Sequence, residues 1–486
     1  MAEALESAAE GLSVVTVPAP WRPAADALAV LRRLGSSSAV AWLPPDGTRL
    51  VGLDSAATLI GPVSSAALRR EAEALLTSID ITTHQALPAI APRLLGGFAF
   101  DPHARIEPAW KSFGEGRLVL SRWTYGQKGE HAWLSLAANA PLTDAERDAA
   151  LTELAVIHEA LQSLPEEGTE ARTADPVRAH DPAIPGKVTS ESRSSAIGEP
   201  AGEAPEVWKG RVEAILRAIE AGRIAKVVAA RSAELPLAES PDPAAIFREL
   251  VGRFDRCTGF YLEMSGDAFL GATPERLVGV SASDVETEAL AGSAPPGRGE
   301  DLLESEKHRL EHQLVLDEII ARLGPLCDET RKGETRPLEL PNVAHLRTPI
   351  HARRRRAAGP LDFVSVLHPT PAVGGVPREE AVRWIEESEP ASRGWYAGPF
   401  GWLDASGDGE FVVALRSALL QGGVARLYAG AGIVSGSDPE AEWVETEAKM
   451  RAVREAIAAV RGSRGEVAWS RGGGGSDAGA GRIVPA

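Results

Sequence analysis

The sequence predicts an α+β fold, in which large antiparallel or mixed β-sheets are flanked by helices. Segments with strand character come in hairpin-like groups, over 259–280 and 398–434, and helical segments lie between these groups. A doubly wound parallel sheet would instead alternate single strands with single helices. The chain has 486 residues, of which 44% are hydrophobic and 24% charged, a balance typical of a globular protein with a sizeable core.

The first 164 residues mix short apolar strands with helical patterns, and we expect them to form an N-terminal α/β half packed on the remainder. They contain no recognisable chemical motif. The expected elements are a strand over 93–101 with a glycine pair, a hairpin formed by 117–126 and 131–140, and a helix over 143–164 that begins at a threonine cap.

Composition divides the rest of the chain. Residues 165–206 are rich in Pro, Ser, Gly and charge, which predicts a linker or long loop, and the Gly-rich residues 463–486 predict a disordered tail. Order is expected over 207–462, the predicted catalytic region. Its elements are helices over 207–222, 243–254, 304–324 and 438–462, and a strand over 224–235 next to the hairpins named above.

Net charge and cysteine content exclude several classes of protein. At −17 the chain is a poor partner for nucleic acid or an anionic membrane, and a small anionic substrate would need a locally cationic pocket. Only Cys257 and Cys327 are present, which argues against a cysteine-based zinc site or a disulfide framework and fits the cytoplasm. No apolar run reaches the ~18 residues of a membrane span, and the acidic N-terminus does not look like a signal peptide.

Two residues are candidates for acid–base chemistry. Lys226 lies within the apolar strand IAKVVAAR, where an ammonium is costly to bury, so it is either a snorkelling side chain or a base with a lowered pKa. Glu275, in GATPERL, would project from the tip between two strands. An ordinary acidic turn residue would give the same pattern.

A second set of carboxylates predicts a metal site. Glu442, Glu445 and Lys449 are spaced three and four apart, so they share one helix face, although a solvated face would show the same spacing. Glu311 leans towards an apolar helix face that Leu310 helps to define. Two helices offering carboxylates could hold one hard cation such as Mg²⁺.

Two further features predict an anion-binding pocket. Gly292 and Ser293, in the loop EALAGSAPPG, would let a ligand approach backbone N–H groups. Arg416 lies in the apolar strand FVVALRSALL with no acid nearby in the sequence. A substrate carboxylate is a natural partner for such an arginine.

These stretches together resemble the chorismate-utilising enzymes of menaquinone, siderophore and tryptophan synthesis, over residues 207–460. The motifs that carry the resemblance are KVVAAR, GATPERL, ALAGSA, SEKHRLEH, VAHLRT, LHPTPAVGGVPREEA, SRGWYAGPFG, VALRSA, YAGAGIVSGSDPEAEW and ETEAK. The resemblance implies the family's α/β sandwich of antiparallel sheets and helices, which includes the N-terminal half. Lys at position 226, the LAGSA loop and the HPTPAVGG segment are similar to the isochorismate synthases of this family.

This resemblance implies a role for each matched residue. Lys226 resembles the base that activates water for attack at C2 of chorismate, and Glu275 the acid that protonates the departing C4 hydroxyl. Glu311 and Glu445 resemble Mg²⁺ ligands, with Glu442 holding metal-bound water. The residues expected to contact substrate are Gly292, Ser293, His345, Ala372, Val373, Tyr396, Leu415, Arg416, Gly430, Gly432 and Lys449.

Other activities stay open from the sequence. A salicylate synthase would make isochorismate and then eliminate pyruvate, an anthranilate synthase would use ammonia, and a metal-binding acidic scaffold would not turn over chorismate. His308 stands where the family often has an acid, which bears on Mg²⁺ affinity. A monomer is expected, because isochorismate synthases of this family are often monomers.

Overall fold

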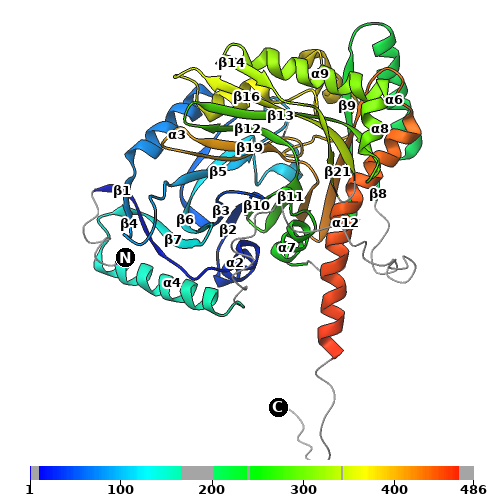
Figure 1. Cartoon of the computed structure of the whole chain (residues 1–486). Coiled ribbons are helices and arrows are strands. Elements are labelled where there is room, and N and C mark those ends of the chain that lie inside the picture. Colours follow the sequence, from blue (N-terminus) through cyan, green and yellow to red (C-terminus); the bar gives the residue numbers. More distant parts are fainter. Residues whose placement is uncertain (2–9, 105, 166–200, 238–240, 341–342, 470–486) are drawn as a thin grey trace, which may run out of the picture.

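A computed structural model describes the chain except for residues 2–9, 105, 166–200, 238–240, 341–342 and 470–486 (Figure 1). Within the described residues, 21 strands form one hydrogen-bonded network with two arms that meet at β6 (Gly116–Lys128). Every described pairing is antiparallel except that of β1 with β4, where four residue pairs run parallel. The predicted α+β class with large antiparallel sheets is confirmed.

The first arm starts at the N-terminal strands and ends at the strand that carries Lys226. In spatial order after β6 it contains β3 (Arg49–Ile60), β2 (Ser38–Leu43), β10 (Thr258–Met264), β11 (Asp267–Thr273), β20 (Ser417–Gln421), β21 (Val424–Ile433), β9 (Lys226–Pro236) and the short β17 (Gly375–Val376) and β8 (Ala201–Gly202). On the other side of β6 lie β7 (His131–Ala140), β1 (Gly11–Pro18) and β4 (Asp80–Thr83).

The second arm leaves the other part of β6. It contains β5 (Arg93–Phe98), β18 (Pro399–Asp404), β19 (Gly409–Val413), β12 (Arg276–Ser281), β13 (Asp284–Ala294) and β16 (Ala344–Arg354), and the last of these also pairs with β14 (Cys327–Lys332) and β15 (Arg336–Glu339). The pairs β2–β10 and β5–β18 join strands from the two halves of the chain, so both halves share one sheet network.

Helices cover the sheets, and two of them flank the ends of the two arms. The helices are α2 (Ala24–Leu31), α3 (Ala66–Ser78), α4 (Asp144–Gln162), α6 (Pro205–Glu220), α7 (Pro243–Arg253), α8 (Gly299–Glu304), α9 (Glu306–Leu323), α10 (Pro360–Leu367), α11 (Arg378–Ser388) and α12 (Pro439–Trp469), with 3₁₀ turns at Arg32–Leu34 and Pro108–Trp110. Helix α9 packs on β13 and α12 packs on β21. None of the described helices combines the length and hydrophobicity needed to cross a bilayer.

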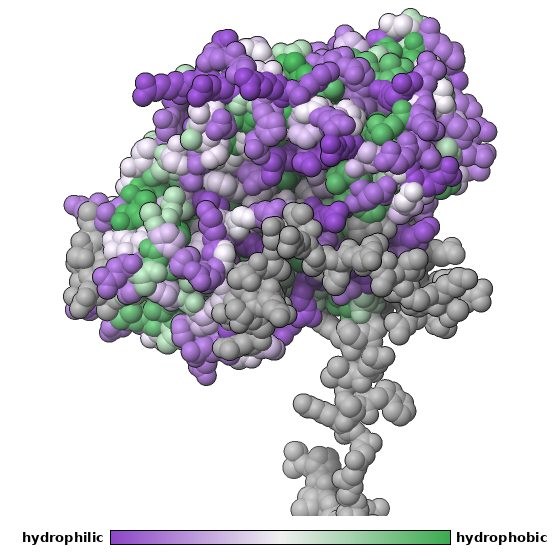
Figure 2. All heavy atoms as spheres, viewed as in Figure 1, coloured by the Kyte–Doolittle hydropathy of each residue, from purple (hydrophilic) through white to green (hydrophobic). Residues whose placement is uncertain are grey.

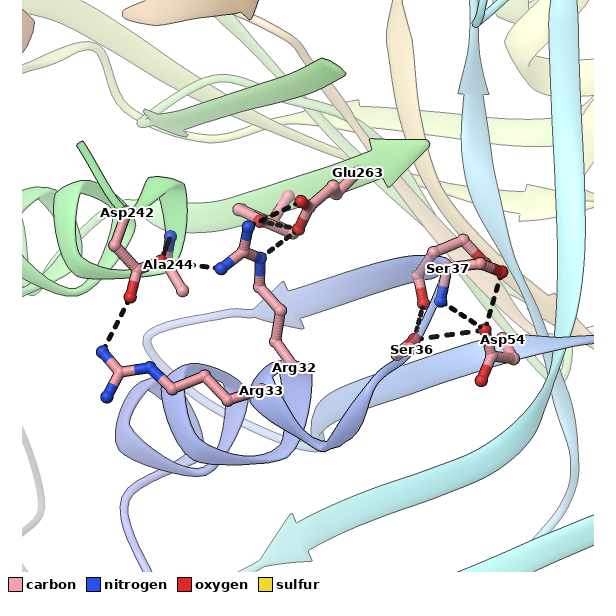
Figure 3. Close-up of polar contacts among 10 residues, drawn as sticks. Arg32, Arg33, Ser36, Ser37, Asp54, Asp242, Ala244 and Glu263 are labelled. Carbon is pink, nitrogen blue, oxygen red and sulfur yellow. Dashed lines mark hydrogen bonds and ion pairs between the residues drawn. The ribbon is translucent and has the colours of Figure 1, made fainter. Parts of the chain in front are cut away.

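A partly exposed ion-pair network joins the N-terminal half to the other half (Figure 3). Arg32 donates to both carboxylate oxygens of Glu263 on β10, and its Nη1 lies 3.0 Å from Asp242 Oδ1 at the start of α7. Arg33 pairs with the other oxygen of Asp242 at 2.9 Å.

On the face shown in Figure 2 hydrophilic residues predominate and hydrophobic ones are scattered.

Three expected boundaries differ from the structure. The helix expected over 304–324 is α9, which begins at Glu306 because the hydroxyl of Ser305 accepts from the backbone N–H of His308 and caps the helix; residues 299–304 form the separate short helix α8. Strand β8 and the start of α6 lie within the range 165–206 expected to be a linker, most of which lies outside the described residues. Helix α12 continues past 462 to Trp469, and the remainder of the expected tail is not described.

The orientation of α9 also differs in part from expectation. Leu310 is 48% exposed and does not contribute to the buried face. That face is formed by Glu311, His312, Val315, Leu316, Ile319 and Leu323. Glu311 therefore points inward as expected, but the buried face that it belongs to includes His312 and Val315 instead of Leu310.

Candidate active site

One cavity lies where the ends of the two strand arms meet helices α9 and α12. It encloses about 710 Å³, including its opening to solvent. All thirteen residues that we expected to be catalytic or to bind substrate line it, and so do Glu311 and Glu445. Glu442 is the one candidate outside the lining. Segments spread over more than 220 positions of sequence, from Lys226 to Lys449, therefore converge on a single space.

Lys226 opens β9 and is buried along its whole length, with 1% of its side chain exposed. This excludes the snorkelling alternative, because a snorkelling lysine keeps its ammonium in water. Its Nζ lies 3.0 Å from Glu311 Oε1 on α9. The amine thus sits at the cavity wall, with one carboxylate to balance its charge.

Glu275 lies between β11 and β12 and faces the same cavity as Lys226. Its backbone is held at both ends, since its N–H donates to the Thr273 hydroxyl at 3.2 Å and its carbonyl accepts from Val413 at 3.0 Å. Burial, together with repulsion from Glu288, raises the pKa of Glu275 to about 8, although the ammonium groups of Lys226 and Lys449 act in the other direction. The carboxyl therefore carries its proton at neutral pH, unlike an exposed acid in a turn.

Each of the three candidate metal-binding glutamates pairs with a different lysine. Glu311 pairs with Lys226 as described above. On α12, Glu445 Oε1 lies 2.6 Å from Lys449, which also donates to the carbonyl of Gly430 at 2.9 Å.

The third pair lies at the edge of the cavity. Glu442 Oε1 is 2.7 Å from Nζ of Lys307 on α9. Burial and the neighbouring Glu445 raise the pKa of Glu442, and Lys307 opposes both effects. Partial burial would also raise the pKa of Glu445, but Lys449 and the Ser293 hydroxyl outweigh it, and this pKa is lowered.

The chemistry of these donors suits a hard divalent cation. Mg²⁺ is commonly held by one or two carboxylates together with water and substrate oxygens. Glu311 and Glu445 supply two carboxylates to one cavity, from the two helices α9 and α12. In the described part of the chain no three His, Cys, Asp or Glu side chains gather closely enough to form a complete metal site. The protein thus offers two ligands and leaves the other positions to water or substrate.

Arg416 lines the same cavity, but it lies between β19 and β20 at φ +47° and not within a strand as expected. Arg416 is 6% exposed, burial lowers its pKa, and its Nη1 has no hydrogen-bond partner among the described residues. Among those residues no carboxylate forms an ion pair with it. An unpaired buried guanidinium is costly, which indicates that an anionic ligand completes this part of the cavity.

His345 and Tyr396 line the same cavity as uncharged groups. The Nδ1–H of His345 donates to the carbonyl of Gly292 at 2.9 Å, so the other ring nitrogen is an acceptor. Burial and the nearby cations Arg416 and Lys449 lower the pKa of His345 to about 3. Burial raises the pKa of Tyr396, whose ring stacks on Tyr428 with centroids 5.0 Å apart.

Glycine at position 432 leaves room for the ion pair between Lys226 and Glu311. A Cβ atom there would lie 2.2 Å from Glu311 Oε1 and 3.0 Å from Lys226 Cε. It would therefore collide with the Lys226–Glu311 pair. Gly292, at φ +77°, adopts a backbone conformation that other residues rarely take.

Several lining residues were not predicted from the sequence. They are Val228, Pro274, Leu290, Ala291, Tyr428 and Ala429. Three of them could have been found by strand periodicity, because side chains two apart on a strand share a face. Val228 follows Lys226 by two, Tyr428 precedes Gly430 by two, and Leu290 precedes Gly292 by two.

Comparisons with known proteins agree with this geometry. The salicylate biosynthesis isochorismate synthase of Pseudomonas aeruginosa is 37% identical over 393 residues, which cover 79% of this chain and 78% of that protein. The isochorismate synthase MenF of Escherichia coli is 32% identical over 464 residues, or 92% of this chain and 94% of that protein. The solved structure of the menaquinone-specific isochorismate synthase MenF from Escherichia coli superposes with a TM-score of 0.73 at 28% identity, over 94% of this chain and 97% of that one. A family described as "Chorismate binding enzyme" matches residues 2–458, and the chain belongs to this family.

Proposed function

We propose that the protein is an isochorismate synthase. It would convert chorismate to isochorismate by adding water at C2 of the ring with loss of the C4 hydroxyl, in a Mg²⁺-dependent reaction. The observation that carries this proposal is that a buried amine, Lys226, and a protonated carboxyl, Glu275, line one cavity together with Arg416, whose Nη1 has no hydrogen-bond partner among the described residues. The names of the relatives described above support the same reaction.

Lys226 and Glu275 would share the proton transfers. Water is a poor nucleophile and hydroxide a poor leaving group at neutral pH, so the reaction needs a base for the first and an acid for the second. Lys226 would take a proton from the attacking water, a step that requires its uncharged amine form. Glu275 would donate its proton to the departing hydroxyl, a role that the pKa of about 8 supports.

The remaining residues would bind and orient the substrate, which carries two carboxylates. Arg416 and Tyr396 would hold the carboxylate of the enolpyruvyl group, and Ala372 and Val373 would form an apolar wall beside the ring. Glu311 and Glu445 would hold Mg²⁺, whose positive charge would bind the ring carboxylate, and Glu442 would contact the ion through water. Gly292, Ser293, Gly430 and Lys449 would line the carboxylate sites, with His345 and Leu415 next to the ring.

Product analysis tests the proposed reaction against its closest alternatives. We expect the full chain, incubated with chorismate and Mg²⁺, to form isochorismate as its main product on a chromatogram that also resolves salicylate and anthranilate. Salicylate with an equal amount of pyruvate would assign the protein to the salicylate synthases instead. Anthranilate formed on addition of ammonium would assign the protein to the ammonia-using members of the family. Absence of any turnover of chorismate would favour the interpretation as a non-catalytic metal-binding scaffold.

The pH profile tests the role of Glu275. Because its folded pKa is about 8, the carboxyl is protonated below that pH and loses its proton above it. We therefore expect loss of this proton to lower kcat/KM above pH 8, by up to about tenfold for each further pH unit, measured between pH 6 and 10. Glu275→Gln should lower activity and abolish this decline in what remains. A Gln variant that retained the wild-type alkaline limb would show that another group is the acid.

A further inference from the structure

Lys307 lies beside the carboxylates of α9 and α12 without lining the cavity. Its Nζ is 2.7 Å from Glu442 Oε1, and Glu442 is only 2% exposed. Lys307 also precedes Glu311 by four residues on α9, so the two side chains share one face of that helix. The ammonium thus stands between the helix that carries Glu311 and the helix that carries Glu442 and Glu445.

The position of this lysine is unfavourable for the helix itself. Ser305 caps α9, so Lys307 falls in the first turn, where the helix dipole disfavours a positive charge. Burial also works against its charge, whereas the 2.7 Å contact with Glu442 favours it. The benefit of a lysine at this position therefore comes from the neighbouring carboxylates, since the helix terminus opposes a positive charge.

The ammonium of Lys307 affects the binding of any other cation to the carboxylates of α9 and α12. Glu442 and Glu445 are close enough for their charges to interact, and Lys307 interacts with both of them and with Glu311. A divalent ion held by Glu311 and Glu445 would be repelled by an ammonium that stays, and would compete with it for Glu442.

We propose that Lys307 is a built-in counter-ion that competes with the divalent cation for the carboxylates of α9 and α12 and so limits the affinity of the site. This inference rests on the cation site of the proposed function. It assigns Lys307 a role in tuning that site and no contact with the reacting atoms. Loss of the lysine should tighten cation binding, whereas a lysine that merely orients Glu442 as a ligand would weaken binding when lost.

The test is a titration of the full chain with Mn²⁺ alone, followed by electron paramagnetic resonance of the free ion. Removing the repulsion in Lys307→Met is expected to lower the dissociation constant by about tenfold. Lys307→Arg keeps the charge and should stay close to wild type. Lys332→Met, which removes an exposed lysine on β14, controls for the change in net charge. An unchanged or weaker affinity of Lys307→Met would overturn the inference.

Two further measurements separate this inference from the proposed function and from misfolding. Binding of Mn²⁺ by the wild-type protein, with loss of this binding in Glu445→Gln, would support the cation site. If Lys307→Met then fails to bind Mn²⁺ more tightly, the role of Lys307 is overturned and the cation site stands. Absence of Mn²⁺ binding to the wild type would overturn both.

In the wild-type protein, Mg²⁺ should also increase the acetylation of Lys307 by acetic anhydride, measured by mass spectrometry, while the acetylation of Lys332 stays constant. Unchanged labelling of Lys307 would contradict the proposal that the cation displaces Lys307 from Glu442.

Discussion

Lys226→Gln is expected to lower kcat/KM for isochorismate formation by roughly 10²–10⁴-fold, which is the usual contribution of a general base. Gln is similar in length and polar, but it cannot accept a proton from water at neutral pH. The variant also removes the ammonium that lies 3.0 Å from Glu311. Measured rates of isochorismate formation with saturating Mg²⁺ check this prediction directly.

The control must separate lost chemistry from lost folding. Glu311 is 8% exposed and loses its ion-pair partner in this variant, so the melting temperature should fall as well. Lys226→Arg keeps the ion pair but not the basicity, because a guanidinium does not give up its proton in proteins. It should therefore fold and remain inactive. A folded Lys226→Gln protein with more than one tenth of wild-type activity would show that this amine is not the base.

The cavity was largely predictable from the sequence, because its residues stand in short segments with a strong local pattern. An isolated lysine in an apolar strand and an isolated arginine in another apolar stretch are conspicuous, and both Lys226 and Arg416 line the cavity. Glu275 is conspicuous for its place between two strands. Hydrophobic periodicity placed the strands and helices that carry these residues, and the resemblance to a family added their roles.

The partners of the charged residues were not predictable in the same way. The pair between Lys307 and Glu442 joins side chains that are 135 positions apart, and no pattern within either helix specifies it. The pair between Arg32 and Glu263, which spans 231 positions, is similar. Such contacts depend on how helices and sheets pack in three dimensions, whereas periodicity reports only which face of an element is buried.

The exact start of α9 was missed although the sequence contains its signal. Ser305 is a good N-cap residue, and the structure uses it as one. The charged and apolar residues around it keep helical spacing, which favoured a start at 304 instead of 306. The consequence is functional, since the cap fixes where α9 starts and thereby places Lys307 in its first turn.

Arg416→Met is expected to change stability and substrate binding in opposite directions. In the ligand-free protein Arg416 is buried, and its Nη1 lacks a partner among the described residues. Replacing it with an apolar side chain of similar length removes this cost and should raise the free energy of unfolding by about 1–3 kcal/mol. The same change deletes the partner of a substrate carboxylate, which should weaken binding by about 2–4 kcal/mol and raise KM roughly 30- to 1000-fold.

Arg426→Met on β21 provides the matched control, because it removes the same charge from an arginine that already has a protein partner. Arg426 lies 2.6 Å from Glu234 and is partly exposed, so its loss should leave KM unchanged and should not raise the melting temperature. Thermal unfolding without ligand and steady-state kinetics with chorismate measure both quantities on the same preparations.

An Arg416→Met protein that is destabilised would mean that another protein group satisfies the guanidinium. A stabilised one with normal KM would mean that the cavity takes its anion elsewhere. Only the combination of higher stability and weaker binding fits an arginine held without a partner for the sake of the substrate, because its desolvation is then compensated when the carboxylate arrives.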